Sequence, residues 1–364
     1  MEHITIEECC DILDSRRIPI TASERRNGRY PYYGANGIQD YVADYIFDDE
    51  LVLLAEDGGN FGSKTRPIAY RVSGKCWVNN HAHVLKPMAN VDVDYLCYSL
   101  MFYDTEELVN GATRQKLTQA AMRKMLIPQR PITEQKKIVS ELSKIQSIIS
   151  VRQQQLQQLD ELVKARFIEL FGDPVYNSKR LPIQRLCKLG SLDRGRSQHR
   201  PRNDPKLLNG PYPLIQTGEV ASAGLYITKY KNTYSELGLR QSKMWSAGTL
   251  CITIAANIAQ TAILTFDACF PDSVVGFLPN DSINAIYMHY WFGFFQKILE
   301  KQAPQVAQKN INLKILSELN VIVPTQEKQE QFAAFVEQTD KSKVAVQKAL
   351  DEAQLLFDSL MQKY

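Results

Sequence analysis

The sequence predicts an α/β protein with two globular α/β domains joined by two long antiparallel coiled-coil helices and a pseudo-two-fold internal repeat. Two stretches carry apolar residues at alternating steps of four and three, as in coiled-coil helices. The two stretches keep the same phase at a separation of 194 residues. Each follows β-prone runs, such as Leu51–Ala55 and Thr249–Ala255, that are bounded by Gly, Asn and Asp. A tandem duplication explains all three observations.

Length and composition are those of a soluble protein with two domains. The chain has 364 residues, of which 44% are hydrophobic and 23% charged. The first ten residues, MEHITIEECC, contain acids where a signal peptide needs basic and then apolar residues, so we expect a cytoplasmic location. Seven cysteines without a CxxC pair indicate reduced, buried thiols and no metal framework. A net charge of +3 is too small to indicate a nucleic-acid partner by itself.

The helical stripes predict an interface between the two helices. The residues expected to form it are Ile138, Leu142, Ile145, Ile149, Leu156, Leu159 and Val163 in the first stripe, and Phe332, Val336, Val346, Leu350, Phe357 and Leu360 in the second. Arg152, Arg166 and Lys343 interrupt the pattern. At about 1.5 Å per residue each helix spans roughly 50 Å. The simplest partner for the first helix is the second helix of the same chain, packed antiparallel, and pairing in a homodimer is the alternative.

Proline and glycine mark the predicted boundaries. Pro131 and Pro324 precede the two helices, and Gly172 follows the first. We therefore expect a first globular domain at 1–130, a first helix at 131–172, a second globular domain at 173–323 and a second helix at 324–364.

Basic residues gather at equivalent early places in the two globular segments, which indicates a DNA-binding surface. Arg and Lys suit phosphates, and Arg, Asn and Gln can pair with base edges. The candidates in the first segment are Arg16, Arg17, Arg25, Arg26, Arg29, Tyr32, Tyr33, Asn36, Lys64, Arg66, Asn80 and His81. Those in the second are Arg194, Arg196, His199, Arg200, Arg202, Gln216, Lys229, Arg240 and Lys243. For any single pair of these residues, a solvated surface is the simpler interpretation.

Catalytic and metal-binding motifs are not met. The chain has no Pro-Pro, which excludes the amino-methyltransferase motif, and in Gly58–Thr65 a serine separates the last glycine from the lysine of a phosphate loop. That segment is expected to be a turn. His81 and His83 would share a face if both lay on a strand, but no third ligand is evident, so we predict no metal site.

Three runs in the first segment, from Tyr30 to Ile38, from Leu53 to Gly58 and from Trp77 to His83, resemble the target-recognition domain of the specificity subunits of type I restriction–modification enzymes. The segments beginning at Ile127 and at Pro324 resemble the conserved helical regions of that family. The resemblance covers essentially the whole chain. The second helix is entered through Val-Pro-Thr-Gln, without the double proline of the first.

The resemblance implies a non-catalytic subunit that reads one half of a split, asymmetric DNA target with each recognition domain. It implies two methyltransferase subunits as partners, which carry S-adenosylmethionine, with motor-nuclease subunits joining for cleavage. The chain itself would hold no cofactor. Two other hypotheses stay open at this point: a self-contained modification enzyme, and a coiled-coil scaffold without a role on DNA.

Overall fold

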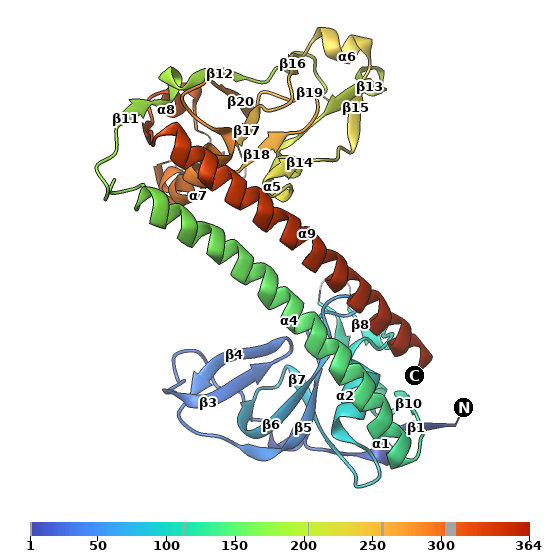
Figure 1. Ribbon diagram of the computed structural model, residues 1–364. Helices are drawn as coiled ribbons and strands as arrows, with labels where there is room; N and C mark the ends of the chain where they lie inside the picture. Colours follow the sequence, from blue (N-terminus) through green and yellow to red (C-terminus); the bar gives the residue numbers. More distant parts are fainter. Residues whose placement is uncertain (1, 112–113, 203, 256–257, 303–310) are drawn as a thin grey trace. The chain divides into compact units, whose positions relative to one another are not determined.

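A computed structural model describes residues 2–111, 114–202, 204–255, 258–302 and 311–364. The chain divides into two units (Figure 1): unit 1 comprises residues 1–153 and 348–364, and unit 2 comprises residues 154–347. Two long helices, α4 (Ile132–Phe171) and α9 (Gln326–Lys363), each contribute one half to either unit. Each unit therefore consists of a globular part and a pair of helix halves.

The globular part of unit 1 is built on a six-stranded sheet of order β2-β7-β5-β6-β3-β4. The strands of this globular part, including those outside the six-stranded sheet, are β1 (His3–Thr5), β2 (Cys10–Ile12), β3 (Asn27–Gly34), β4 (Gly37–Val42), β5 (Phe47–Ala55), β6 (Ala69–Val78), β7 (Ala82–Pro87), β8 (Val109–Asn110), β9 (Lys116–Leu117) and β10 (Leu126–Pro128). Its short helices are α1 (Ile6–Cys9), η1 (Asp14–Arg16), α2 (Val93–Met101) and α3 (Gln119–Arg123). The run 51–55 of β5 is fully buried, as expected for a continuous apolar strand covered on both faces.

The globular part of unit 2 contains a five-stranded sheet, β12-β20-β17-β18-β14, and a four-stranded sheet, β15-β13-β19-β16. Its strands are β11 (Ile183–Arg185), β12 (Gly190–Arg194), β13 (Leu208–Leu214), β14 (Tyr226–Ile227), β15 (Asn232–Tyr234), β16 (Met244–Trp245), β17 (Leu250–Thr253), β18 (Thr261–Leu264), β19 (Ala268–Cys269), β20 (Val274–Pro279) and β21 (Asn320–Ile322). Its helices, apart from the halves of α4 and α9, are η2 (Leu186–Lys188), η3 (Pro205–Leu207), α5 (Thr217–Ser222), α6 (Glu236–Arg240), α7 (Ala285–Gln302) and α8 (Leu313–Ser317).

The two sheets share a four-stranded nucleus with the same order and register, which confirms the predicted duplication. In unit 1 it is β2-β7-β5-β6, and in unit 2 it is β12-β20-β17-β18. Cys10 pairs with Pro87 in the first and Gly190 with Pro279 in the second. Beside the nucleus, β3 pairs in parallel with β6 and β14 pairs in parallel with β18, but β4 of the first sheet has no counterpart in the five-stranded sheet. The nucleus is therefore conserved between the units, whereas the strands around it differ.

The segment that leads into each long helix repeats as well. Thr118 caps α3 by accepting a hydrogen bond from the Ala121 N–H at 3.2 Å, and Asn312, 194 residues later, caps α8 in the same way. A two-stranded ribbon follows in each unit, β1 with β10 and β11 with β21. The duplication thus extends from local caps to strand pairing.

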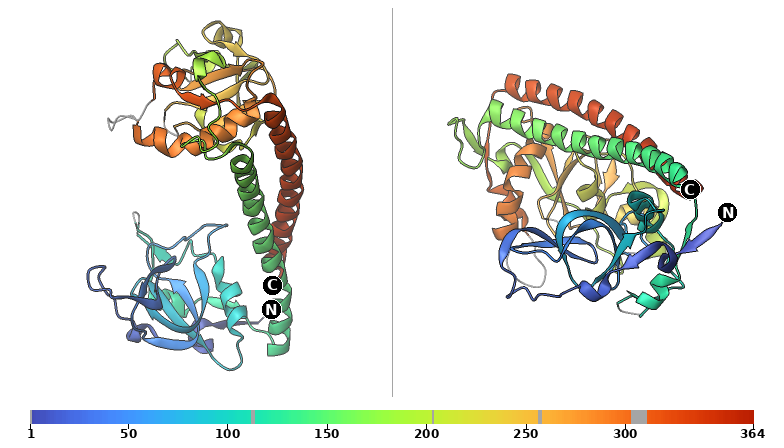
Figure 2. Two further views of the ribbon diagram at one scale, coloured as in Figure 1. Left: turned by 60° about the vertical axis from the view of Figure 1, so that its left-hand side comes forward. Right: turned by 90° about the horizontal axis from the view of Figure 1, so that it is seen from below.

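The helix halves pack within each unit. Of the residues predicted at the interface, the buried ones are Ile138, Leu142, Ile149, Val163, Phe332, Val336 and Phe357, and the half-buried ones are Ile145, Leu156, Leu159, Val346, Leu350 and Leu360. In unit 2 the ring of Phe171 lies 5.5 Å from that of Phe332, whereas Asp160 bonds Lys343 at 2.5 Å. Higher residue numbers in α4 therefore lie beside lower residue numbers in α9. The two helix halves thus run antiparallel, and both belong to the same chain (Figure 2).

Polar residues within the helical stripes find partners either across the helix pair or within their own helix. Lys343 bonds Asp160, the Arg166 guanidinium lies 5.7 Å from the Phe335 ring centre, and the buried Thr339 donates its hydroxyl to the Phe335 carbonyl. These residues therefore interrupt the apolar pattern without leaving the interface.

Helix α4 ends where glycine permits a left-handed residue. Gly172 has φ +77 and its N–H donates to the Ile168 carbonyl at 2.7 Å. None of the helices that the structure describes combines the length and the hydropathy needed to cross a lipid bilayer.

Candidate nucleic-acid interface

The first pair of predicted arginines, Arg16 and Arg17, points in two directions. Arg16 is exposed, donates to the Ile46 carbonyl at 3.1 Å and lies over the Phe47 ring. Arg17 is turned inward, with Nη1 at 2.6 Å from Glu56 and 2.8 Å from the Ala82 carbonyl. Since its guanidinium is already committed to these partners, we withdraw Arg17 as a DNA contact and assign it a structural role.

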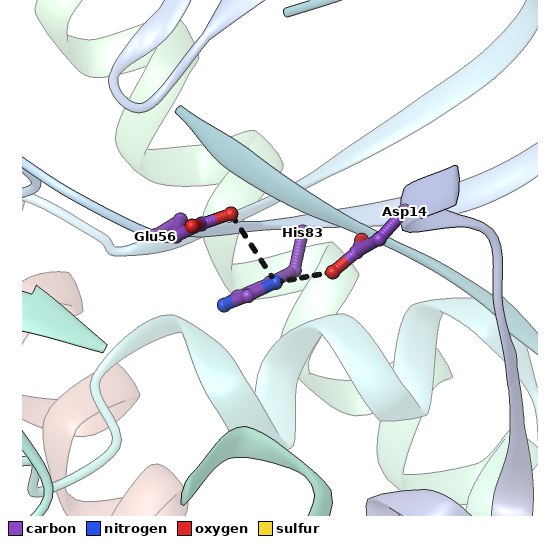
Figure 3. A group of neighbouring side chains, drawn as sticks. All are labelled: Asp14, Glu56 and His83. Carbon is purple, nitrogen blue, oxygen red and sulfur yellow. Dashed lines mark hydrogen bonds and ion pairs between the residues drawn. The ribbon is translucent and has the colours of Figure 1, made fainter. Parts of the chain in front are cut away.

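Arg17 neutralises a buried group made of Asp14, Glu56 and His83 (Figure 3). His83 Nδ1 lies 2.6 Å from an Asp14 oxygen and 3.7 Å from Glu56. Burial disfavours ionised Asp14, but the hydrogen bond and charge of His83, with hydrogen bonds from the Val84 N–H and from Gln119, together lower the pKa of the Asp14 carboxyl. Three ligand atoms within 4.8 Å could suit a metal ion, yet Arg17 and Lys116 already give the two carboxylates positively charged partners. The group is thus a network of ion pairs and hydrogen bonds that joins η1, β7 and the residue after β5.

The two histidines of the sequence motif occupy different environments. His83 lies on β7 and is fully buried, whereas His81 lies in the turn before β7 and is half-buried, with Nδ1 at 2.5 Å from Asp57. The two histidines do not share a strand face, because His81 lies in the turn outside the strand.

His81 lines an open depression in unit 1 together with Arg25 and Asn80, two further predicted contacts. Arg25 lies 4.3 Å above the Tyr32 ring and 3.4 Å from Asp40. Tyr32 forms part of the lining but is only 1% exposed, and its hydroxyl bonds the backbone of Ile20. Tyr32 therefore supports Arg25 from below, and we withdraw it as a direct DNA contact.

Sequence reasoning missed Gln39 and Arg114 in the same depression. Arg114 Nη2 lies 3.0 Å from Asp57 and 3.4 Å from His81 Nδ1. Gln39 accepts a hydrogen bond from the buried Asn79 at 3.2 Å. Neither residue belongs to a basic cluster in the sequence, so no local signal could have found them.

The other predicted residues of unit 1 lie on strands and loops around the sheet. Arg26 and Arg29 are exposed beside or at the start of β3, Asn36 is exposed in the turn between β3 and β4, and Lys64 and Arg66 are exposed between β5 and β6. Tyr33 is half-buried against Tyr70, and burial raises the pKa of its hydroxyl. The structure does not place these residues in the depression.

In unit 2 the predicted arginines lie at the end of β12 and in the loop after it, and most of them gather around Asp272. Arg194 donates twice to the Asp272 carbonyl, at 3.0 and 2.7 Å, and Arg202 bonds its carboxylate at 2.6 Å. Arg200 lies 3.8 Å from the same carboxylate, and Arg196 is exposed. One aspartate thus organises three of the four arginines.

His199 and the remaining cations of unit 2 have separate positions. His199 pairs with Asp204 at 3.1 Å, and Lys243 lies over the Trp245 ring and bonds Asp193 at 2.9 Å. The hydrogen bond from Lys243 lowers the pKa of Asp193. The others are exposed residues: Arg240 ends α6, Lys229 follows β14 and Gln216 caps α5.

The two basic regions begin at equivalent places of the duplicated nucleus. Arg16 stands six residues after Cys10 of β2, and Arg196 stands six residues after Gly190 of β12, the two residues that start the matched strands. Both arginines are exposed. An exposed arginine therefore follows the same edge strand in each unit.

Comparisons with known proteins agree with this duplicated architecture. The family model described as the type I restriction modification DNA specificity domain matches residues 1–161 and again 186–353. A Haemophilus influenzae protein named as a type I restriction enzyme specificity subunit is 26% identical over 299 residues, which are 79% of this chain and 74% of that protein.

Two solved structures share the fold over the whole chain. The specificity subunit of a type I restriction–modification system from M. genitalium has a TM-score of 0.64 at 14% identity, covering 100% of this chain and 95% of that one. A chain from a study of complex assembly and conformational transition of the type I system has a TM-score of 0.56 at 15% identity, covering 100% and 96%. The two matched regions, with the duplicated nucleus, show that this chain belongs to the type I restriction–modification specificity family, as a non-catalytic subunit for DNA sequence recognition.

Proposed function

We propose that this chain reads a bipartite, asymmetric DNA target, with one half-site for each globular part. The observation that carries the proposal is the pair of exposed arginines, Arg16 and Arg196, after matched strands of the duplicated nucleus. Because the two arginines occupy equivalent positions of a repeated fold, each globular part would approach DNA in the same way. Because the surrounding strands and side chains differ between the units, the two half-sites would differ in sequence.

The proposed contacts are the exposed or partly exposed predicted residues together with the two that the sequence did not reveal. In unit 1 the depression offers Arg25, Asn80, His81, Gln39 and Arg114. In unit 2 the loop after β12 offers Arg196, Arg200 and Arg202. Phosphate contacts of these cations would supply salt-sensitive affinity, and base-edge contacts would supply specificity.

The long helices are proposed to hold the partners and to set the distance between half-sites. Helix surfaces turned away from the interface keep exposed apolar residues, such as Ile148 and Val151 of α4 at 48% each and Leu355 of α9 at 70%. Such residues suit helices of other subunits. Two methyltransferase subunits would dock on the helices and domains and supply S-adenosylmethionine, and motor-nuclease subunits would join them for cleavage.

We propose that the segments predicted from the sequence can be exchanged as units: 1–130 and 173–323 for recognition, and 131–172 and 324–364 for the helices. The test replaces residues 178–320 with the recognition segment of another specificity subunit. The exchanged chain, assembled with its methyltransferase, should methylate a target in which one half is new and the other is unchanged. A change in both halves, or in neither, would contradict the modular reading of DNA. Methyl transfer by the purified chain alone would favour a self-contained enzyme.

A further inference from the structure

The arginine-bearing loop of unit 2 is held by three consecutive residues, two of which, Gln241 and Ser242, are not among the proposed DNA contacts. The loop follows β12, and the structure describes it from Gly195 to Arg202. The residues that hold it, Gln241, Ser242 and Lys243, come directly after α6 and are called the clamp below. Each clamp residue bonds the loop or its flanking strand with its side chain.

Gln241 makes the central contacts of the clamp. Its Oε1 accepts hydrogen bonds from the backbone N–H groups of Gln198 and His199, at 2.7 and 3.1 Å. Among the described residues, no acceptor lies within hydrogen-bond distance of the buried Gln241 Nε2. Gln241 therefore holds the loop through its side-chain oxygen.

The other two clamp residues fix the loop on either side of its first arginine. The Ser242 hydroxyl donates to the Arg196 carbonyl at 3.0 Å. Lys243 bonds Asp193, at the end of β12, at 2.9 Å. The clamp thus holds the backbone at Arg196, Gln198 and His199, and it binds the side chain of Asp193 before them.

Backbone position matters here because base recognition is geometrically demanding. A bidentate contact to a base edge needs a side chain that starts from a defined place, and a loop ordered before binding loses less entropy when DNA arrives. The clamp provides both conditions, and Gln241 and Ser242 do so without themselves having to touch DNA.

We propose that Gln241 and Ser242 are positioning residues that set the base preference of the half-site read by unit 2. The inference rests on the proposed function and deepens it. It assigns part of the sequence specificity to residues behind the DNA-facing loop.

The test compares Gln241→Leu, which removes the acceptor, and Ser242→Ala, which removes the donor and is the milder change. Gln241→Glu keeps an oxygen acceptor in place and serves as the conservative rescue. Ser246→Ala, an exposed serine in the next turn of the chain, is the matched control. Each full chain is assembled with its methyltransferase, and the modified bases are sequenced at both half-sites.

Gln241→Leu and Ser242→Ala should lower discrimination at one or more bases of the second half-site by at least about fivefold and leave the first half-site unchanged. Gln241→Glu should retain the wild-type base preference even where its added charge lowers affinity, because specificity is a ratio of affinities. An unchanged second half-site in both variants would overturn the inference, and so would equal relaxation in both halves or in the control.

A second measurement separates this inference from the proposed function. In the full chain without DNA, Gln241→Leu should raise the hydrogen-exchange rates of the Gln198 and His199 amides by at least about tenfold. Unchanged rates would overturn the clamp. A wild-type chain that directs no methylation would overturn the proposed function and leave the exchange result standing.

Discussion

Gln135 and Gln329, 194 positions apart, make the same three hydrogen bonds with their buried side chains. Each Oε1 accepts from the backbone N–H just before α2 or α7, and each Nε2 donates to two carbonyls. The partners are Asp92, Asn90 and Arg130 for Gln135, at 2.8, 3.0 and 2.9 Å, and Asn284, Ser282 and Pro324 for Gln329, at 2.8, 3.1 and 2.9 Å. In both units this amide ties the start of a long helix to the globular part.

Replacing either glutamine with leucine should destabilise its own unit. Gln135→Leu removes three hydrogen bonds and leaves buried backbone groups without partners, so the free energy of unfolding should fall by about 3 kcal/mol. Urea titration followed by hydrogen exchange in each unit measures the loss and its location. Gln158→Leu, at an exposed position of α4, is the control, and a Gln135→Leu chain no weaker than this control would contradict the role.

The buried charge group of unit 1 should make stability depend on acid pH. Asp14 has a lowered pKa in the folded chain, so the folded state binds fewer protons than the unfolded state, whose aspartate titrates near 3.8. The stabilisation is complete above that value and is lost as the pH falls through it toward the folded pKa. The free energy of unfolding of Asp14→Asn should therefore fall less steeply than wild type between about pH 5 and pH 3. If the free energy of unfolding of wild type and of Asp14→Asn fell in parallel with pH, Asp14 would be excluded as the origin of the pH dependence. Asp11→Asn, at an exposed position of β2, is the control.

Adjacent helix residues in unit 2 should respond in opposite ways to a carboxylate. Val163 is 1% exposed in the core of unit 2, and Leu162 is 49% exposed. Val163→Asp should lower the free energy of unfolding by about 3 kcal/mol or more, because it buries a charge without a partner, whereas Leu162→Asp should cost less than about 1 kcal/mol. Thermal unfolding followed by circular dichroism distinguishes the two, and similar losses would place the packed face of the helix elsewhere.

Substitutions of two neighbouring arginines should likewise have different effects, one on DNA binding and the other on stability. Arg16→Glu changes an exposed side chain, so DNA affinity and its salt dependence should fall while unfolding stays normal. Arg17→Glu puts a third carboxylate beside Asp14 and Glu56, so unit 1 should lose stability. Fluorescence anisotropy with duplex DNA and urea titration measure the two effects. Unchanged DNA affinity in Arg16→Glu would remove that residue from the proposed interface.

Helix length should control the spacing of the proposed half-sites. Seven residues inserted beside Asp160 in α4 and beside Lys343 in α9 keep the antiparallel stripes in phase and lengthen each helix by about 10 Å. The spacer between methylated half-sites should grow by about three base pairs. Sequencing of modified bases reports the spacer, and an insertion in one helix alone should disrupt the helix pair. A spacer that does not change would refute the helices as a ruler.

Much of the fold could be predicted because its signals are local. The alternation of four and three along each helix requires only that neighbouring turns share a face, and Gly172 or the proline before each helix acts within one or two residues. The same holds for the continuous apolar run of β5, whose burial follows from its composition. The duplication adds a comparison within the chain, so that a cap seen at Thr118 has its counterpart at Asn312.

The pattern of residues along the chain is enough to predict the two helices, their common phase, the duplication and the places where basic residues gather. Which of these cations remain available depends on the folded arrangement. Arg17 and Arg16 are neighbours in sequence, yet Glu56, 39 residues away, holds one of them inside. Charge pairing and burial depend on residues that folding brings together from distant positions, whereas helix periodicity is repeated at every turn and can be seen before the chain folds.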